Sequence, residues 1–200
     1  FNQPISGVLK ADGIADFGIV YVNGAKVGEL NRVTGKDSIE VEIPFNSTLD
    51  ILVENLGRIN YGARISESFK GFTRPITIND NTIEGEWKMY RLPMDKAPQL
   101  SASDHGYVQG LPVIYQGTFN INNVGDTFLD MEQWGKGIVF VNGINLGRYW
   151  HVGPQQTLYL PGCFLKKGQN EIVIFEQLND SRKTTLSGIE TPKLDVLKKQ

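Results

Sequence analysis

Three carboxylates in the second half of the chain, Asp126, Asp130 and Glu132, have side chains suited to glycoside hydrolysis. That reaction uses two carboxylates, about 5–5.5 Å apart in retaining enzymes and about 6.5–9.5 Å apart in inverting ones. On an extended strand Asp126 and Asp130 lie about 13 Å apart, and Asp130 and Glu132 about 7 Å. The closer pair would occupy an open sheet face, with Leu129 and Met131 turned to the core. We therefore interpret it as a solvated strand face and predict no catalytic residue.

Nucleophilic and metal chemistry are not indicated either. The chain has one cysteine, Cys163, and two histidines, His105 and His151, neither of which is near it in sequence. Cys163 follows a Pro-Gly turn and precedes an aromatic residue, so we expect a buried, inert thiol. The sequence contains no metal-ligand cluster, phosphate-binding loop or dinucleotide motif, and it predicts neither a metal nor a cofactor.

An aromatic segment near residue 150 is a better candidate for binding. Arg148, Tyr149 and Trp150 precede His151 and a Gly-Pro turn. Aromatic faces beside polar donors can hold a sugar by stacking and hydrogen bonds. Alternatively, Trp150 closes one end of a sandwich and Arg148 pairs with an acidic neighbour. The three residues are therefore candidates for sugar binding or for docking.

A second polar segment follows an apolar run in the first half. It extends from Glu54 to Gly62 and includes Arg58, Asn60 and Tyr61. Loops that carry so many polar groups can serve a binding site or an interface. The other interpretation is structural: Glu54 and Arg58 pair, while Asn60 satisfies backbone groups of a long turn. The residues alone leave both open.

The elements that position these residues are predicted to be strands. Apolar runs of four to seven residues, rich in Val, Ile, Tyr and Phe, are bounded by turn residues, a pattern typical of an all-β sandwich. Asn23-Gly24 indicates a tight hairpin. We predict strands at Phe17–Val22, Ser38–Ile43, Asp50–Glu54, Ile76–Ile78, Trp87–Leu92, Val113–Asn120, Asp126–Met131, Gly137–Val141, Thr157–Leu160 and Glu171–Glu176.

An internal repeat divides the chain. Ile19–Gly24 and Ile138–Gly143 share an apolar strand and an Asn-Gly turn, each followed four residues later by glycine. This period is too long for a solenoid and predicts two copies of one β domain, at 1–95 and 96–200. Extra strand material after Leu111 precedes the second copy alone. We therefore expect the first sandwich to be incomplete at its N-terminus and the chain to be part of a longer protein.

Composition excludes some partners. Of the 200 residues 40% are hydrophobic, which suffices for packed cores, and the formal net charge is −2. Without a basic patch, nucleic acid is not expected as a partner. No apolar run reaches 18 residues, so no membrane span is predicted.

Several segments carry a family resemblance. They are Leu52-Val53-Glu54-Asn55-Leu56-Gly57-Arg58-Ile59-Asn60-Tyr61-Gly62, Phe69-Lys70-Gly71, Asp126-Thr127-Phe128-Leu129-Asp130-Met131, Trp134-Gly135-Lys136-Gly137, Val141-Asn142-Gly143-Ile144-Asn145-Leu146-Gly147-Arg148-Tyr149-Trp150, Gly153-Pro154-Gln155 and Thr157-Leu158-Tyr159-Leu160-Pro161. In order and spacing across Phe17 to Glu176, the chain resembles the β-galactosidases of glycoside hydrolase family 35.

The resemblance implies a non-catalytic region. Family members have a catalytic (β/α)₈ barrel with two glutamates, followed by jelly-roll domains of the galactose-binding type. This chain resembles only two tandem jelly rolls, so no catalytic glutamate is carried over and the chain alone should be inactive. The barrel of the same parent chain is the implied partner, and Tyr61 is the implied contact on the aglycone side. A secreted, periplasmic or lysosome-like location is suggested by resemblance only.

Three hypotheses follow. The first is an accessory region of a β-galactosidase, supporting the barrel and shaping its entrance. The second is an autonomous carbohydrate-binding module for β-galactosides, with Tyr149 or Trp150 as an exposed platform. The third is a structural sandwich pair that mediates protein contacts, for example through an open strand edge.

Overall fold

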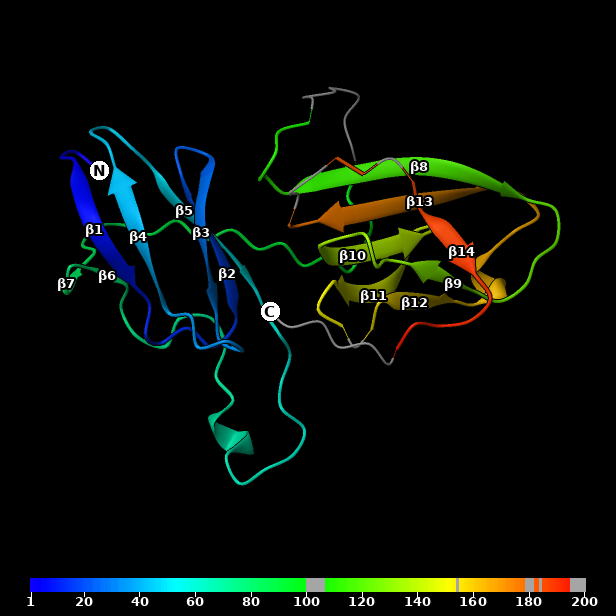
Figure 1. Cartoon of the computed structure of the whole chain (residues 1–200), viewed down its shortest axis with the longest axis horizontal. Coiled ribbons are helices and arrows are strands. Elements are labelled where there is room, and N and C mark those ends of the chain that lie inside the picture. Colours follow the sequence, from blue (N-terminus) through cyan, green and yellow to red (C-terminus); the bar gives the residue numbers. More distant parts are fainter. Residues whose placement is uncertain (100–106, 154, 179–181, 184, 195–200) are drawn as a thin grey trace. The chain divides into compact units, whose positions relative to one another are not determined.

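The structure is a computed structural model that describes residues 1–99, 107–153, 155–178, 182–183 and 185–194 (Figure 1). The chain divides into two compact units, Phe1–Met89 and Tyr90–Gln200, and each is described by itself. His105 lies outside the described residues. The independent domains predicted at 1–95 and 96–200 remain a prediction.

The first unit contains two antiparallel sheets. One has the strand order β4-β1-β6-β7 and the other the order β3-β2-β5. The strands are β1 (Ile5–Lys10), β2 (Phe17–Val22), β3 (Ala25–Asn31), β4 (Ser38–Ile43), β5 (Leu49–Glu54), β6 (Thr77–Ile78) and β7 (Asn81–Thr82), with a short 3₁₀ helix η1 (Ile65–Glu67).

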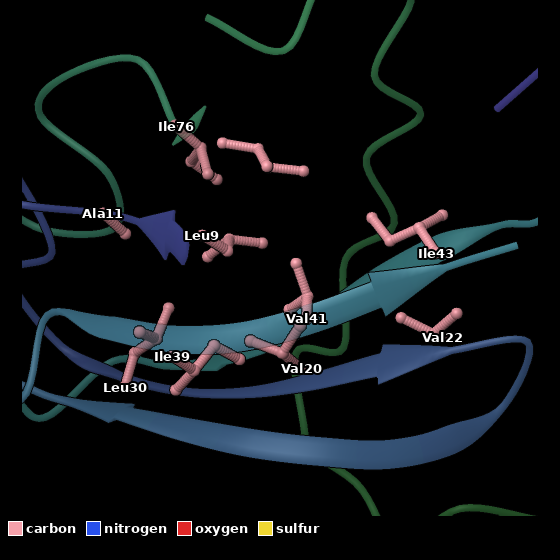
Figure 2. Close-up of a cluster of buried hydrophobic side chains, with 10 residues drawn as sticks. Leu9, Ala11, Val20, Val22, Leu30, Ile39, Val41, Ile43 and Ile76 are labelled. Carbon is pink, nitrogen blue, oxygen red and sulfur yellow. The ribbon is translucent and has the colours of Figure 1, made fainter. Parts of the chain in front are cut away.

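Apolar side chains from both sheets form the core of this unit. Figure 2 shows Val41 and Ile43 of β4 in one cluster with Val20 and Val22 of β2, joined by Leu9 of β1. On β4 these inward residues alternate with exposed glutamates, which is the pattern of a strand with one buried face. The pattern therefore determines which face of β4 packs against the other sheet.

The second unit repeats this architecture. Its sheets have the orders β11-β10-β13-β8 and β12-β9-β14. The strands are β8 (Val113–Ile121), β9 (Thr127–Asp130), β10 (Lys136–Val141), β11 (Ile144–Trp150), β12 (Thr157–Leu160), β13 (Gly168–Glu176) and β14 (Ser187–Ile189), with a 3₁₀ helix η2 (Gly162–Phe164). Its core includes Met131, Trp134, Tyr149 and Leu158.

The sequence repeat corresponds to a repeat of topology. The order β3-β2-β5 matches β11-β10-β13, and β4-β1-β6 matches β12-β9-β14. In the second unit β8 adds a further strand beside β13. The all-β class and the sandwich architecture predicted from the sequence are confirmed, and the matched segments occupy equivalent strands.

The two repeated hairpins share their backbone geometry. Asn23 and Gly24 have φ of 50° and 76°, and Asn142 and Gly143 have φ of 49° and 80°. Two successive positive φ angles are the requirement of a tight primed turn, which the Asn-Gly pair satisfies. Each hairpin also has a register shift, between Val20 and Tyr21 in the first unit and between Val139 and Phe140 in the second. The predicted hairpin at Asn23-Gly24 is confirmed.

The structure corrects two expectations. Residues 87–92, predicted as a strand, form no ladder, and Met89 and Tyr90 in this segment are strongly exposed. Alternating sequence makes a strand only where a neighbouring strand pairs with it. Cys163 was expected to be buried but is exposed. In η2 the flanking Gly162 is buried and Phe164 packs against the core, so the residue between them faces outward.

Candidate functional site

The polar loop that follows β5 is fixed at its base by one buried carboxylate. Asp16, immediately before β2, is 1% exposed. Its Oδ1 accepts a hydrogen bond from the Leu56 amide at 2.9 Å, and its Oδ2 accepts one from the Gly71 amide at 2.5 Å. Lys70 Nζ lies 3.5 Å from Asp16 Oδ1 and also donates to the Gly57 carbonyl. The loop of residues 55–71 is therefore bound to the sandwich at both ends.

Three predicted site residues lie on this loop, which projects from the strands of the first unit (Figure 1). Tyr61 is 89% exposed, and Arg58 and Asn60 are also exposed. Farther along, Phe69 is 63% exposed, and Arg64 and Glu67 form an ion pair at 2.7 Å on the surface. An exposed phenol ring offers a stacking face and a polar tip, so the loop presents chemistry suited to contact with a sugar.

The other predicted residues lie on β11 in the second unit. Arg148 is exposed, Trp150 is half-buried, and Tyr149 is 1% exposed. The Tyr149 ring meets the buried Trp134 ring edge-on, with centroids 6.4 Å apart. The Trp150 ring lies under the ammonium group of the buried Lys136, 4.4 Å from Nζ to the ring centroid. Tyr149 thus lies in the core of the unit, and Trp150 covers a buried cation.

A buried carboxylate organises this part of the second unit. Glu176, fully buried, accepts hydrogen bonds from the amides of Gly135, Lys136 and Leu178 at 2.8–2.9 Å and from the Tyr149 hydroxyl at 3.1 Å. Burial raises the pKa of Glu176, and its four hydrogen bonds, which favour the ionised form, oppose this shift. The carboxylate therefore joins the ends of β10 and β13 to β11.

The three carboxylates considered for hydrolysis have structural partners. Lys193 Nζ lies 2.7 Å from Asp130 Oδ2 and 2.9 Å from Glu132 Oε2. These two hydrogen bonds raise the pKa of Lys193, that to Asp130 more. Asp126 accepts from the Gly162 amide at 2.8 Å and from the Tyr159 hydroxyl at 2.7 Å. Both bonds lower the pKa of Asp126, the amide contributing more.

A shallow pocket of 220 Å³ lies beside the Glu176 network. Its lining includes Glu132, Trp134, His151 and Lys183. The Trp134 side chain is only 5% exposed, so its ring face is not open to a ligand. The His151 amide donates to the Gly135 carbonyl at 2.7 Å, which fixes the rim.

Two further properties concern the residues that the structure describes. Among them, no three His, Cys, Asp or Glu side chains are grouped so that they could hold a metal ion. Within the same residues, no helix combines the length and apolar character needed to cross a membrane.

The sequence alone did not identify the residues that anchor the 55–71 loop and the ends of β10 and β13. Asp16 and Lys70 lie far from each other in sequence, and no spacing rule connects them. Glu176 carries a weak signal, because Glu54 occupies the corresponding end of β5 in the first copy. A polar residue that recurs at the end of an apolar strand suggests a buried hydrogen-bonding role.

Two family models match the chain, one for each unit. The model described as "Beta-galactosidase, first all-beta domain" matches residues 1–93, and that described as "Beta-galactosidase, galactose-binding domain" matches residues 112–170. Among solved structures, a rhamnosidase from Novosphingobium sp. PP1Y aligns over 90% of this chain and 18% of that one, at 14% identity and a TM-score of 0.31. A likeness this low adds nothing to the assignment.

Curated relatives agree with the family models. A β-galactosidase from Xanthomonas manihotis is 41% identical over 158 residues, which cover 78% of this chain and 26% of that protein. β-Galactosidase-1-like protein 2 from Homo sapiens is 39% identical over 178 residues, covering 86% of this chain and 28% of that protein. The chain thus spans just over a quarter of the length of these relatives. It belongs to the β-galactosidase family, of which it carries the first all-β domain and the galactose-binding domain.

Proposed function

We propose that this chain is the non-catalytic accessory region of a β-galactosidase, a glycoside hydrolase acting on terminal β-D-galactosyl residues. In the parent protein it supports a catalytic (β/α)₈ barrel and shapes the entrance to the active site. The observation that carries the proposal is the loop of residues 55–71, which we call the entrance loop: Asp16 anchors it, and it presents Tyr61 to solvent. Similarity to proteins named β-galactosidases over only about a quarter of their length supports the accessory role.

The partners of the carboxylates favour an accessory role over independent catalysis. Lys193 pairs with both Asp130 and Glu132, and Asp126 is held by Tyr159 and the Gly162 amide. Hydrolysis requires one carboxylic acid and one carboxylate that both reach the same glycosidic bond. Groups already engaged in bonds within the fold are poorly suited to that role, which supports placing the catalytic pair elsewhere in the parent chain.

Tyr61 is the residue that we propose contacts the aglycone. Its ring has no role in the core, since 89% of its surface is exposed. An aromatic contact with a sugar or aryl group is worth about 0.5–1.5 kcal/mol, which corresponds to a 2- to 10-fold change in affinity. Arg58 and Asn60, which are close to it in sequence, are exposed polar residues of the same loop.

The test uses the full-length parent enzyme. Tyr61→Ala should raise KM for aryl and disaccharide galactosides about 2- to 10-fold while leaving the thermal unfolding midpoint unchanged. Phe45→Ala is the matched control, because Phe45 is an exposed aromatic on a different turn of the same unit. Phe45→Ala should have the kinetic constants of the wild type. If Tyr61→Ala has them as well, Tyr61 does not contact substrate.

A second experiment separates the accessory role from an autonomous carbohydrate-binding module. The 200-residue chain is titrated with galactose, lactose and longer β-galactosides by calorimetry, and it is assayed with a chromogenic β-galactoside. The accessory role predicts neither binding nor turnover. Binding that is abolished by Trp150→Ala without loss of stability would favour the module, whereas turnover by pure protein would place the catalytic carboxylates within this chain.

A further inference from the structure

The two copies of the repeat bind an equivalent amide with different carboxylates. Leu56 and Leu178 each lie two residues beyond the glutamate that ends a matching strand, Glu54 of β5 and Glu176 of β13. In the second unit the Leu178 amide donates to Glu176 itself, at 2.9 Å. In the first unit the Leu56 amide donates at 2.9 Å to Asp16, which comes from a different strand end.

The position of Asp16 also differs between the copies. Asp16 immediately precedes β2, and Gly135 immediately precedes the matching strand β10. Gly135 has no side chain, and its amide is itself a donor to Glu176 at 2.8 Å. The carboxylate at this position therefore belongs to the first copy alone, which is also the copy that carries the entrance loop between its strand end and Gly71.

Asp16 does more than bind the strand end. Its second oxygen accepts from the Gly71 amide at 2.5 Å, and the Ala15 amide donates to the Gly71 carbonyl at 2.8 Å. One carboxylate therefore binds the beginning and the end of the entrance loop. Lys70, about one-fifth exposed, compensates its charge and donates to the Gly57 carbonyl, which adds a third tie across the base of the loop.

The rest of the loop has little packing to hold it. Tyr61, Ile65 and Phe69 are all exposed, and the Arg64–Glu67 ion pair is on the surface. Segments with few buried apolar contacts open locally at low free-energy cost, so their geometry depends on the few buried bonds that they make. Asp16 and Lys70 make such bonds at the base of the loop.

We propose that Asp16 is the positioning residue of the entrance loop and that, together with Lys70, it sets the place of Tyr61 at the substrate entrance. This inference rests on the proposed function. Asp16 touches no substrate and acts only through the loop. Its loss should weaken recognition of the aglycone, the part of the substrate next to the entrance, and leave recognition of the galactosyl group unchanged.

The variants are made in the full-length parent enzyme. Asp16→Asn keeps one acceptor oxygen and the size of the side chain, but it cannot bind both amides and the ammonium group at once. Because Asp16 is buried, Lys70→Met provides an independent variant at a partly exposed position that breaks the same base. Asp12→Asn is the matched control, since Asp12 is an exposed aspartate of the same unit that pairs with Arg74 at 3.2 Å.

The first measurement is amide hydrogen exchange. In Asp16→Asn and Lys70→Met, exchange in a peptide covering 57–69 should become about tenfold faster, which corresponds to the loss of one to two hydrogen bonds. Exchange in the β10–β11 hairpin, residues 136–150, should not change. Unchanged exchange in 57–69 in both variants would overturn the inference, whatever the kinetics.

The second measurement is kinetic. For both variants KM for galactosides with a sugar or aryl aglycone should rise about 2- to 10-fold, as for Tyr61→Ala, with little change in kcat. The inhibition constant for free galactose, which lacks an aglycone, should match the wild type. A merely destabilised enzyme would instead lose active molecules and lower kcat for every substrate, which would count against the positioning role.

The outcomes separate the two proposals. Faster exchange together with a raised KM supports both. Faster exchange and an altered KM for Tyr61→Ala, but wild-type kinetics for Asp16→Asn and Lys70→Met, would overturn the positioning role of Asp16 and leave the entrance role of Tyr61. Faster exchange with wild-type kinetics for all three variants would overturn the proposed entrance role itself.

Discussion

The hydroxyl of Tyr149 reaches across the central strand β10 to the Glu176 carboxylate, with a hydrogen bond of 3.1 Å. In the sheet order β11-β10-β13, Gly137 of β10 lies opposite Tyr149 on one side and opposite Glu176 on the other. The absence of a side chain at Gly137 leaves the space in which this bond forms. Gly137, Tyr149 and Glu176 thus form one packed group in the interior of the second sandwich.

Tyr149→Phe should destabilise the second unit by about 1–3 kcal/mol, because it removes a hydrogen bond to a buried carboxylate and preserves the ring. Urea denaturation followed by tryptophan fluorescence measures this, since two of the three tryptophans, Trp134 and Trp150, lie in that unit. Tyr159→Phe is the control. Tyr159 is half exposed and donates a hydrogen bond to the surface residue Asp126. The free energy of unfolding of the Tyr159→Phe variant should therefore stay within about 0.5 kcal/mol of the wild-type value.

Gly137→Ala should destabilise the protein by more than about 3 kcal/mol, or prevent folding of the second unit. A Cβ at this position would lie 1.8 Å from the Phe175 carbonyl oxygen and 2.7 Å from the Tyr149 hydroxyl. The backbone of the β10–β13 ladder would have to move. Gly117→Ala on β8, whose Cβ would meet only Ile172 at 3.8 Å, should be tolerated. Equal stability of the two variants in thermal unfolding would contradict this account.

Glu176 should make stability depend on pH in a defined direction. Burial raises its pKa in the folded state above the ordinary 4.5, so just above that pH the folded protein holds more protons than the unfolded chain. The contribution of Glu176 to stability is therefore complete below the ordinary pKa and is lost as pH rises through the raised value.

Glu176→Gln removes this ionisation and, because its amide nitrogen cannot accept, also lowers stability overall. Urea denaturation of both proteins from pH 4 upward should show their difference in free energy shrinking as pH rises through the raised pKa. Two parallel stability profiles would mean that Glu176 ionises in the folded protein as it does in the unfolded chain.

The contribution of Asp126 to stability should depend on pH in the opposite direction to that of Glu176. The Gly162 amide and, to a smaller extent, the Tyr159 hydroxyl hold the pKa of Asp126 below its usual value. Its contribution to stability is present above the unfolded pKa and is lost as pH falls through the lower folded value. Carboxyl carbon NMR shifts should report the low pKa, and Tyr159→Phe should raise it only part of the way because the Gly162 bond remains. A full return would assign the whole effect to Tyr159.

The sequence by itself determined the β architecture. The alternation of apolar and polar residues on β4 and the near-continuous apolar runs of β2 and β10 predicted strands, because each strand needs a buried face. The Asn-Gly pairs fixed both hairpins because only such residues accept positive φ readily, and the repeat indicated one topology used twice. The sequence also singled out Tyr61 and the loop around it.

Only the tertiary structure decided which side chains hold these parts together. Asp16 meets Leu56 and Gly71, and Glu176 meets Tyr149, because the sandwich brings distant strand ends side by side. Residues 87–92 form no ladder, because no neighbouring strand pairs with them. The turn of η2 makes Cys163 face outward. Periodicity records which face of a strand is buried, whereas a hydrogen bond between remote residues depends on the position of both strands in three dimensions.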